Sequence, residues 1–272
     1  ISLICLSAAF GQAEFQICSI PENSYQLSNH RGLSALNIDN SLNESHVNLS
    51  IIYFPSNINY LNIHYNKYSF SILDYGRMTD QIDNNIINTF SAYEMNLSYN
   101  YKKVFKNILL QLRGGVAYSQ LSTYNSTAII ADIGFSSIND TRFAISLNNI
   151  GLIVKDYTSS AQILPSEIQL GFGKNINGTE TVWGYDMLYH YNIKKPEHIL
   201  CLKVPVRDSF NLRISWTNLR DSMLTDTIFT DWFYGLGTGL EIRKNSVVAD
   251  IGISSLGPAG LVYGMSFYYL TN

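Results

Sequence analysis

After residue 45 the sequence alternates apolar and polar residues in one segment after another, almost to its end. A period of two residues belongs to β-strands, because successive side chains of a strand project to opposite faces of the sheet. In 93–101, Tyr93, Met95 and Leu97 share one face, whereas Glu94 and Asn96 share the other. The repetition predicts an all-β protein with about 14 strands, an even number of the kind that bacterial membrane barrels use.

Strong alternation marks most of these segments, and it is weaker in 58–66, 67–76 and 198–206. The predicted strands lie in 46–54, 58–66, 67–76, 93–101, 108–119, 129–135, 142–148, 168–173, 183–191, 198–206, 210–217, 232–243, 247–254 and 261–269.

The composition favours a membrane barrel over a water-soluble sheet. Charged residues make up 14% of the chain and aromatic residues 13%, with 19 Tyr, yet the mean hydropathy is only +0.01. Soluble domains carry about 25% charged residues. Here the polar face of each strand is mostly Ser, Asn and Gly. We therefore predict a transmembrane antiparallel up-and-down β-barrel in the bacterial outer membrane, surrounded by lipid. The alternative is a soluble β-sandwich or a secreted adhesin.

The connections between strands alternate in length. Short ones are expected at 139–140, 207–208 and 244–245, and longer ones at 77–87, 155–165 and 219–230. Short periplasmic turns and longer outer loops give membrane barrels this asymmetry.

The residues before the barrel divide into two parts. Residues 1–10 are apolar and 11–13 follow a small-x-small pattern, which predicts a signal-peptide remnant at 1–13 with Glu14 as the mature start; the alternative is an N-terminal core strand. Residues 14–44 do not alternate. Leu33 and Leu36 form an i, i+3 pair, which favours a short helical plug in the lumen over a disordered leader. Residues 45–272 form the predicted barrel.

Charged residues at inward positions are the candidate lumen-lining groups. They are Glu94, Arg113, Asp132, Arg142, Asp186, His190, Arg213, Glu241 and Asp250. Carboxylates and guanidiniums are nearly balanced, which favours internal ion pairs that rigidify and fill the barrel. The alternative is a selective channel with a field across it.

The sequence shows no catalytic, metal-binding or cofactor motif. The five histidines make no metal-binding spacing, and the chain has no GxSxG, P-loop or CxxC motif. Asp186 and His190 share one strand face, where a hydrolytic site is the alternative; two polar residues in a wet lumen are the favoured explanation. We predict no enzyme, no cofactor and no metal. A net charge of −3 gives no footprint for nucleic acid. Cys18 and Cys201 either form a disulfide or stay as free thiols.

Several stretches resemble one protein family. They read YSQLSTY at 118–124, ADIG at 131–134, FAISLNNIG at 143–151, DYT at 156–158, LPSEIQLG at 164–171, GK at 173–174 and SLGPAGL at 255–261. Taken together, they are similar to the PorV/PorQ family of FadL-like outer-membrane barrels, and the resemblance covers nearly the whole mature chain.

The resemblance implies a 14-stranded barrel that serves the attachment of secreted cargo at the cell surface in type IX secretion. Its implied partners are proteins of the sortase and attachment complex. The family usually carries a glycine-rich segment with an Asn-Pro-Ala-like motif before the barrel, and residues 29–33 (NHRGL) stand in that place here. A FadL-like uptake channel for hydrophobic small molecules is the alternative function.

Overall fold

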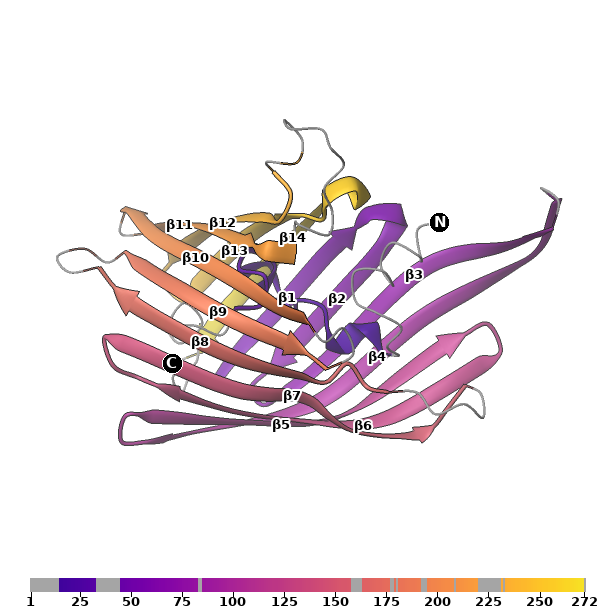
Figure 1. Ribbon diagram of the computed structural model, residues 1–272, viewed down its shortest axis with the longest axis horizontal. Coiled ribbons are helices and arrows are strands. Elements are labelled where there is room, and N and C mark those ends of the chain that lie inside the picture. The colour runs from indigo at the N-terminus through magenta and orange to yellow at the C-terminus, as the bar shows by residue number, and fades with distance from the viewer. Residues whose placement is uncertain are drawn as a thin grey trace.

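The protein is a single sheet closed on itself. The computed structural model describes residues 15–32, 45–82, 85–157, 163–176, 179, 181–191, 195–207, 209–219, 231 and 233–271. In it, 14 antiparallel strands pair with their neighbours in chain order, and β14 pairs with β1 to close the barrel (Figure 1). A closed up-and-down barrel confirms the predicted fold, and a sandwich of two stacked sheets is excluded.

The strands differ in length and lie in the predicted segments, but the predicted strand at 232–243 begins later than expected, at Leu236, because residues 233–235 form a turn. They are β1 (Ser45–Phe54), β2 (Ile58–Tyr65), β3 (Tyr68–Ile82), β4 (Asn85–Phe105), β5 (Ile108–Leu121), β6 (Tyr124–Ser137), β7 (Thr141–Lys155), β8 (Glu167–Asn175), β9 (Val182–His190), β10 (Lys195–Arg207), β11 (Phe210–Thr217), β12 (Leu236–Lys244), β13 (Val247–Ser255) and β14 (Leu261–Thr271). Short helices are η1 (Gln16–Cys18), α2 (Ser24–Ser28), η2 (Pro55–Asn57) and η4 (Gly257–Ala259). None of the helices in the described ranges is long and apolar enough to cross a membrane.

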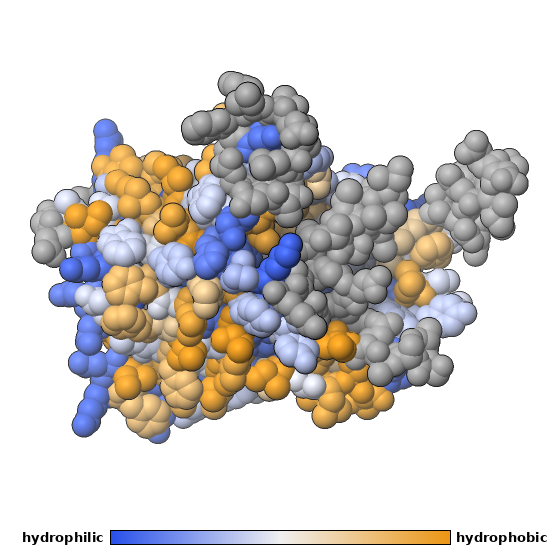
Figure 2. Space-filling model, in the orientation of Figure 1, coloured by the Kyte–Doolittle hydropathy of each residue, from blue (hydrophilic) through white to orange (hydrophobic). Residues whose placement is uncertain are grey.

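The outer face of the wall is apolar, as the alternation predicts. On β7, Phe143 and Ile145 are exposed on the outside, whereas Ser146 is buried on the inside. Apolar side chains gather over the barrel wall in Figure 2. Water-soluble monomers rarely expose large continuous apolar surfaces. A closed barrel leaves no sheet edge unpaired, which is what spanning a bilayer requires. The protein is therefore an outer-membrane β-barrel.

The two rims of the barrel differ, and we name them by their connections. The turn end carries the connections after the even-numbered strands, such as residues 66–67, 106–107 and 245–246. The loop end carries those after the odd-numbered strands, including the longest, 156–166 and 218–235. The predicted contrast between short and long connections holds at these positions.

The predicted long connection at 77–87 is wrong. β3 continues to Ile82 and β4 begins at Asn85, so the two strands form a long hairpin that projects beyond the loop end (Figure 1). The register shifts between Asp74 and Arg77 and again between Asp80 and Gln81. Each β-bulge adds a residue to one strand and so interrupts the period-two pattern. That interruption concealed the strand in the sequence.

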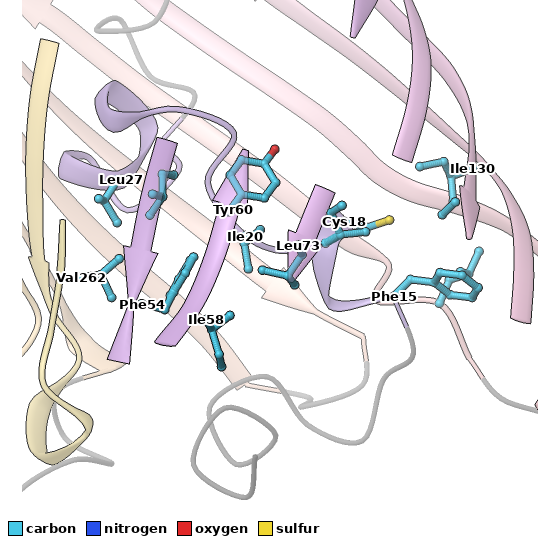
Figure 3. Close-up of a cluster of buried hydrophobic side chains, with 14 of the residues drawn as sticks. Phe15, Cys18, Ile20, Leu27, Phe54, Ile58, Tyr60, Leu73, Ile130 and Val262 are labelled. Atoms are coloured by element: carbon cyan, nitrogen blue, oxygen red, sulfur yellow. The ribbon is translucent and has the colours of Figure 1, made fainter. Parts of the chain in front are cut away.

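Residues 15–32, which we call the inner segment, lie inside the barrel. Phe15, Ile17 and Leu27 pack against inward residues of the wall in one buried apolar cluster (Figure 3). The wall residues of this cluster include Ile52, Phe54, Ile58, Tyr60, Leu73, Ile130 and Val262. The alternation predicts a polar inner face, but part of the inner face is apolar. Near the loop end it is apolar, because there it meets protein and not water.

The helix of the inner segment is α2. Asn23 caps it, its side chain accepting a hydrogen bond from the backbone N–H of Gln26 at 2.8 Å. The predicted helical pair Leu33 and Leu36 lies outside the described residues, and so does the predicted signal peptide at 1–13. Residues 33–44 of the predicted plug are likewise outside them.

Candidate functional site

The inner segment rests on a surface of glycines contributed by β12 and β13. A Cβ atom on Gly252 would lie 2.2 Å from the backbone oxygen of Ser24, which is far inside van der Waals contact. A Cβ on Gly237 would lie 2.6 Å from the backbone oxygen of Ser28, and one on Gly239 would lie 2.6 Å from Ser28 Oγ. Glycine is needed where backbones approach this closely. The wall is therefore shaped to receive α2.

We expect Gly252→Ala to displace α2 from the wall, because the added methyl group would overlap the backbone of Ser24. The displacement should expose Cys201, whose thiol lies 3.7 Å from the backbone oxygen of Asn29 and is buried in the folded protein. A polar maleimide, with the labelled peptide identified by mass spectrometry, should modify Cys201 faster in this variant than in the parent chain.

Gly134→Ala is the matched control for Gly252→Ala. Gly134 also faces the lumen, but the nearest atom to its Cβ position is the Cβ of Ser146 at 3.5 Å, an ordinary contact. Its labelling rate should equal that of the parent chain. Equal labelling of Cys201 in both variants would contradict the tight seating of α2.

Arg213 is the centre of the first ion-pair group. Its guanidinium lies 2.6 Å from Asp250 and 3.5 Å from Glu241, and all three side chains are fully or almost fully buried. Its Nε also donates to Ser28 Oγ at 3.1 Å, and its guanidinium carbon lies 4.3 Å from the centre of the Tyr25 ring. These contacts join three strands of the wall to α2.

Two further hydrogen bonds fix the start of α2 to the same wall. The Ser24 hydroxyl donates to Asp250 Oδ1 at 2.6 Å, and the Ser24 backbone N–H donates to Ser266 Oγ at 2.9 Å. A buried carboxylate needs such donors, because taking a charge out of water is costly unless it is paired and hydrogen-bonded. Asp250 thus has partners from both the wall and the inner segment.

His190 lies between two buried carboxylates in the second group. Its Nδ1 lies 3.3 Å from Glu167 and its Nε2 lies 3.3 Å from Glu197. Glu167 also forms an ion pair with Arg31 of the inner segment. The Thr217 hydroxyl donates to Glu197 at 2.7 Å. Three wall strands are therefore linked through charges to the end of the inner segment.

Arg113 is the centre of the third group. It pairs with Asp132 on the neighbouring strand β6 and with Glu22 of the inner segment. One of its amino groups also donates to Asn149 Oδ1 at 3.4 Å. Like the other two groups, this one combines wall–wall pairs with a contact to the inner segment.

Asn149 lies in a β-bulge of β7 that anchors both the inner segment and a loop. Its φ is 57°, in the left-handed region, and the register of β6 and β7 shifts between Ala131 and Ile133. The Asn149 amide donates to the backbone oxygens of Cys18 at 3.0 Å and Pro165 at 3.1 Å. Its own N–H donates to Asp132 at 2.7 Å. The NNIG stretch is therefore a structural anchor.

The other predicted lumen residues have separate positions. Glu94 accepts hydrogen bonds from the backbone N–H of Ile17 at 2.7 Å and from the Tyr75 hydroxyl at 3.1 Å. Asp186 is fully buried next to the inner segment, and a Cβ on Gly32 would lie 2.9 Å from its carboxylate. Arg142 is half-buried at the turn end of β7. The structure thus groups most of these residues in the lumen but keeps Arg142 at the rim.

Sequence reasoning missed several members of these groups. They are Glu22, Arg31, Asn149, Glu167 and Glu197. Glu167 shares the parity of the inward Gln169 and could have been found from it. Glu22 and Arg31 come before the barrel, where no periodicity gives their direction. Asn149 lies in a bulge, where periodicity fails.

Both described cysteines, Cys18 and Cys201, are buried and free, so no disulfide joins them. Burial raises the pKa of the Cys18 thiol, which therefore stays protonated at neutral pH. Within the described residues, no group of three or more His, Cys, Asp or Glu side chains is placed to hold a metal ion.

Comparisons with known proteins agree with the fold. No family model and no curated protein matches the sequence. Among solved structures, the toluene transporter TbuX of Ralstonia pickettii is similar over 98% of this chain and 98% of its own, with a TM-score of 0.52 and 8% identity. Omp33 of Acinetobacter baumannii covers 84% of this chain and 98% of its own, with a TM-score of 0.47 and 10% identity. At such low identity the similarity to TbuX shows the barrel fold alone.

Proposed function

We propose that this barrel is a non-enzymatic component of type IX secretion, similar to PorQ of the PorV/PorQ family. In this role it holds a fixed shape in the outer membrane while partner proteins of the sortase and attachment complex contact its rim or loops. Secreted cargo is then attached at the cell surface beside it.

The resemblance to the family is the first support, because its stretches coincide with the parts that hold the inner segment. FAISLNNIG contains the Asn149 bulge, and ADIG contains Asp132, which accepts a hydrogen bond from the Asn149 N–H. LPSEIQLG contributes Pro165 and Glu167, which contact Asn149 and Arg31 respectively. In this chain, the stretches that carry the resemblance are therefore also the ones that hold the inner segment.

The observation that carries the proposal is that occupied lumen. The inner segment is held by three ion-pair groups, of which the one around Arg213 is fully buried, and by a glycine surface, and it fills the barrel next to β11, β12 and β13. A scaffold needs a closed and rigid barrel, and ion pairs that join several strands to the inner segment supply rigidity. A transport channel needs an open path through the barrel, and the inner segment lies in that path.

Deletion of the gene in the source bacterium tests the proposal. Secreted cargo should then appear unattached or unprocessed in the medium, and a copy of the gene on a plasmid should restore its display on the cell surface. Surface proteomics measures both outcomes. Normal cargo display in the deletion strain would reject the secretion role.

A second candidate is uptake of hydrophobic small molecules. Two observations favour it: the similarity in fold to a toluene transporter and the apolar cluster inside the wall near the loop end. The same deletion strain separates the two functions. Slower uptake of radiolabelled toluene with normal cargo display would favour transport, whereas normal uptake with lost display would favour secretion.

A further inference from the structure

The inner segment fills only part of the lumen. α2 packs against β1 and against β11 to β14, and a cavity of about 280 Å³ remains beside it, toward β2 to β8. Side chains of β14 and of β1 to β8 line it, together with the inner segment. Small-molecule binding sites typically have volumes of about 300–1,000 Å³, so the volume of this cavity is close to that of the smallest such sites.

The walls of this cavity are rich in groups that both donate and accept hydrogen bonds. The amide side chains of its wall come from six different strands. They include Asn48, Asn62, Asn100, Gln111, Asn148 and Gln169. Each amide has a carbonyl acceptor and an NH₂ group with two donors, so each can bind a ligand even where one of its atoms already bonds within the protein. Such internal bonds are made by Asn48, Asn62, Asn148 and Gln169. Sugar hydroxyls also donate and accept, so a ring of amides matches a polyhydroxylated molecule.

The charges around the cavity compensate one another. Its lining contains three carboxylates and three cationic side chains. Arg31 forms an ion pair with Glu167, and Arg113 forms ion pairs with Glu22 and Asp132. Lys102, the remaining cation of the lining, is exposed to solvent near the turn end and forms no ion pair within the described residues. An ionic ligand deeper in the cavity would break the arginine pairs or remain unpaired itself, and either is costly in a buried site. The site therefore favours a neutral ligand.

One buried polar group on this wall lacks a partner within the part of the chain that the structure describes. Ser146 is only 3% exposed and lines the cavity, and its hydroxyl makes no hydrogen bond there. Buried polar groups nearly always have partners, because leaving one unpaired costs free energy. This hydroxyl is placed to bond with an occupant of the cavity.

The cavity faces the turn end. His64 and Ser69 flank the turn at 66–67, and Lys102 and Gln111 lie near the turn at 106–107. The apolar cluster of the inner segment lies toward the other rim, where Phe54 ends β1 and Ile58 begins β2. Short turns mark the periplasmic side of membrane barrels. A ligand would therefore enter from the periplasm.

From this geometry we infer that the cavity is a binding site for a neutral polyhydroxylated solute of monosaccharide size, taken up from the periplasmic side. The amides bind its hydroxyl groups, and the internally paired charges exclude ionic analogues. This function is separate from cargo attachment, so either can fail without the other.

Isothermal titration calorimetry on the purified full-length chain tests the site. The detergent should be an amine oxide, since a maltoside headgroup would compete. We expect saturable binding of N-acetylglucosamine, and binding at least about tenfold weaker for cationic glucosamine and anionic glucuronate, which are of similar size. Equal affinities for the three probes would overturn the inferred chemistry.

Two glycine variants locate the binding in the cavity. Gly134→Leu places an apolar side chain into the cavity, where a Cβ has room, and should abolish the heat of binding. Gly114→Leu is the matched control on the outer face, where no atom lies within 4 Å of the Cβ position, and it should bind like the parent chain. Heat-modifiable migration on a gel verifies that each variant folds.

Gln111→Leu replaces Gly134→Leu as the test of the cavity if Gly134→Leu does not fold. It removes one amide from the lining and should weaken binding about tenfold, the effect of one lost hydrogen bond to a buried partner. Absence of measurable binding of N-acetylglucosamine to the parent chain, or full binding by Gly134→Leu, would show a water-filled lumen only and overturn the inference.

Discussion

Replacement of Arg213 by Met should destabilise the barrel by about 3–5 kcal/mol, the usual cost of removing one partner from a buried ion pair. The guanidinium is fully buried, and its loss leaves Asp250 and Glu241 without their main cationic partner. The contact with the Tyr25 ring is lost as well. Reversible urea unfolding in lipid vesicles measures the free energy of unfolding of the parent chain and the variant.

Arg243→Met is the matched control for this prediction. Arg243 lies 3.6 Å from the same carboxylate, Glu241, but its side chain is 44% exposed. Solvent screens such a pair, so its loss should cost only about 0–1 kcal/mol. Combining Arg213→Met with Glu241→Gln and Asp250→Asn removes the orphaned charges and should restore part of the stability. Equal losses for Arg213→Met and Arg243→Met would contradict the buried network.

Ile145→Arg should cost about 2–4 kcal/mol, because it places a charge on the lipid-facing surface. Ile145 is 48% exposed on the outside of β7. Its neighbours in register are Phe135 on β6 and Leu170 on β8, which are also exposed apolar residues. The arginine would therefore have no polar neighbour on either side. The same unfolding experiment in vesicles measures the loss.

Gln111→Arg is the control for the lipid-facing substitution. Gln111 points into the hydrated cavity, so a new guanidinium there remains solvated. We expect a clearly smaller loss of stability than for Ile145→Arg. Losses of the same size would show that the two faces of the wall meet similar surroundings.

The strands were predictable from the sequence because one physical rule governs nearly all of them. An outward residue such as Phe143 or Ile145 meets lipid, while its neighbour Ser146 meets the lumen, so the pattern repeats every two residues. The same parity correctly oriented Arg213, Glu241 and Asp250, which the structure places in one buried group. Parity assigns a direction, but it does not choose partners.

The partners depended on contacts that no local pattern encodes. Arg113 pairs with Glu22, which is 91 positions away in the chain, and the Asn149 amide reaches Cys18 across 131 positions. The extension of β3 and β4 was missed because two bulges break the alternation there. The apolar inner wall around Ile52 and Phe54 follows from the inner segment that covers it, which period two cannot reveal.

Spin-label scanning along β7 tests the central claim most directly. Single cysteines at 143–148, in a background with Cys5, Cys18 and Cys201 replaced by alanine, would carry nitroxides in a reconstituted bilayer. We predict high oxygen collision rates at residues 143, 145 and 147, and low rates at residues 144, 146 and 148, where the label meets the lumen. Rates that do not alternate along these six positions would contradict a wall with one lipid face and one interior face.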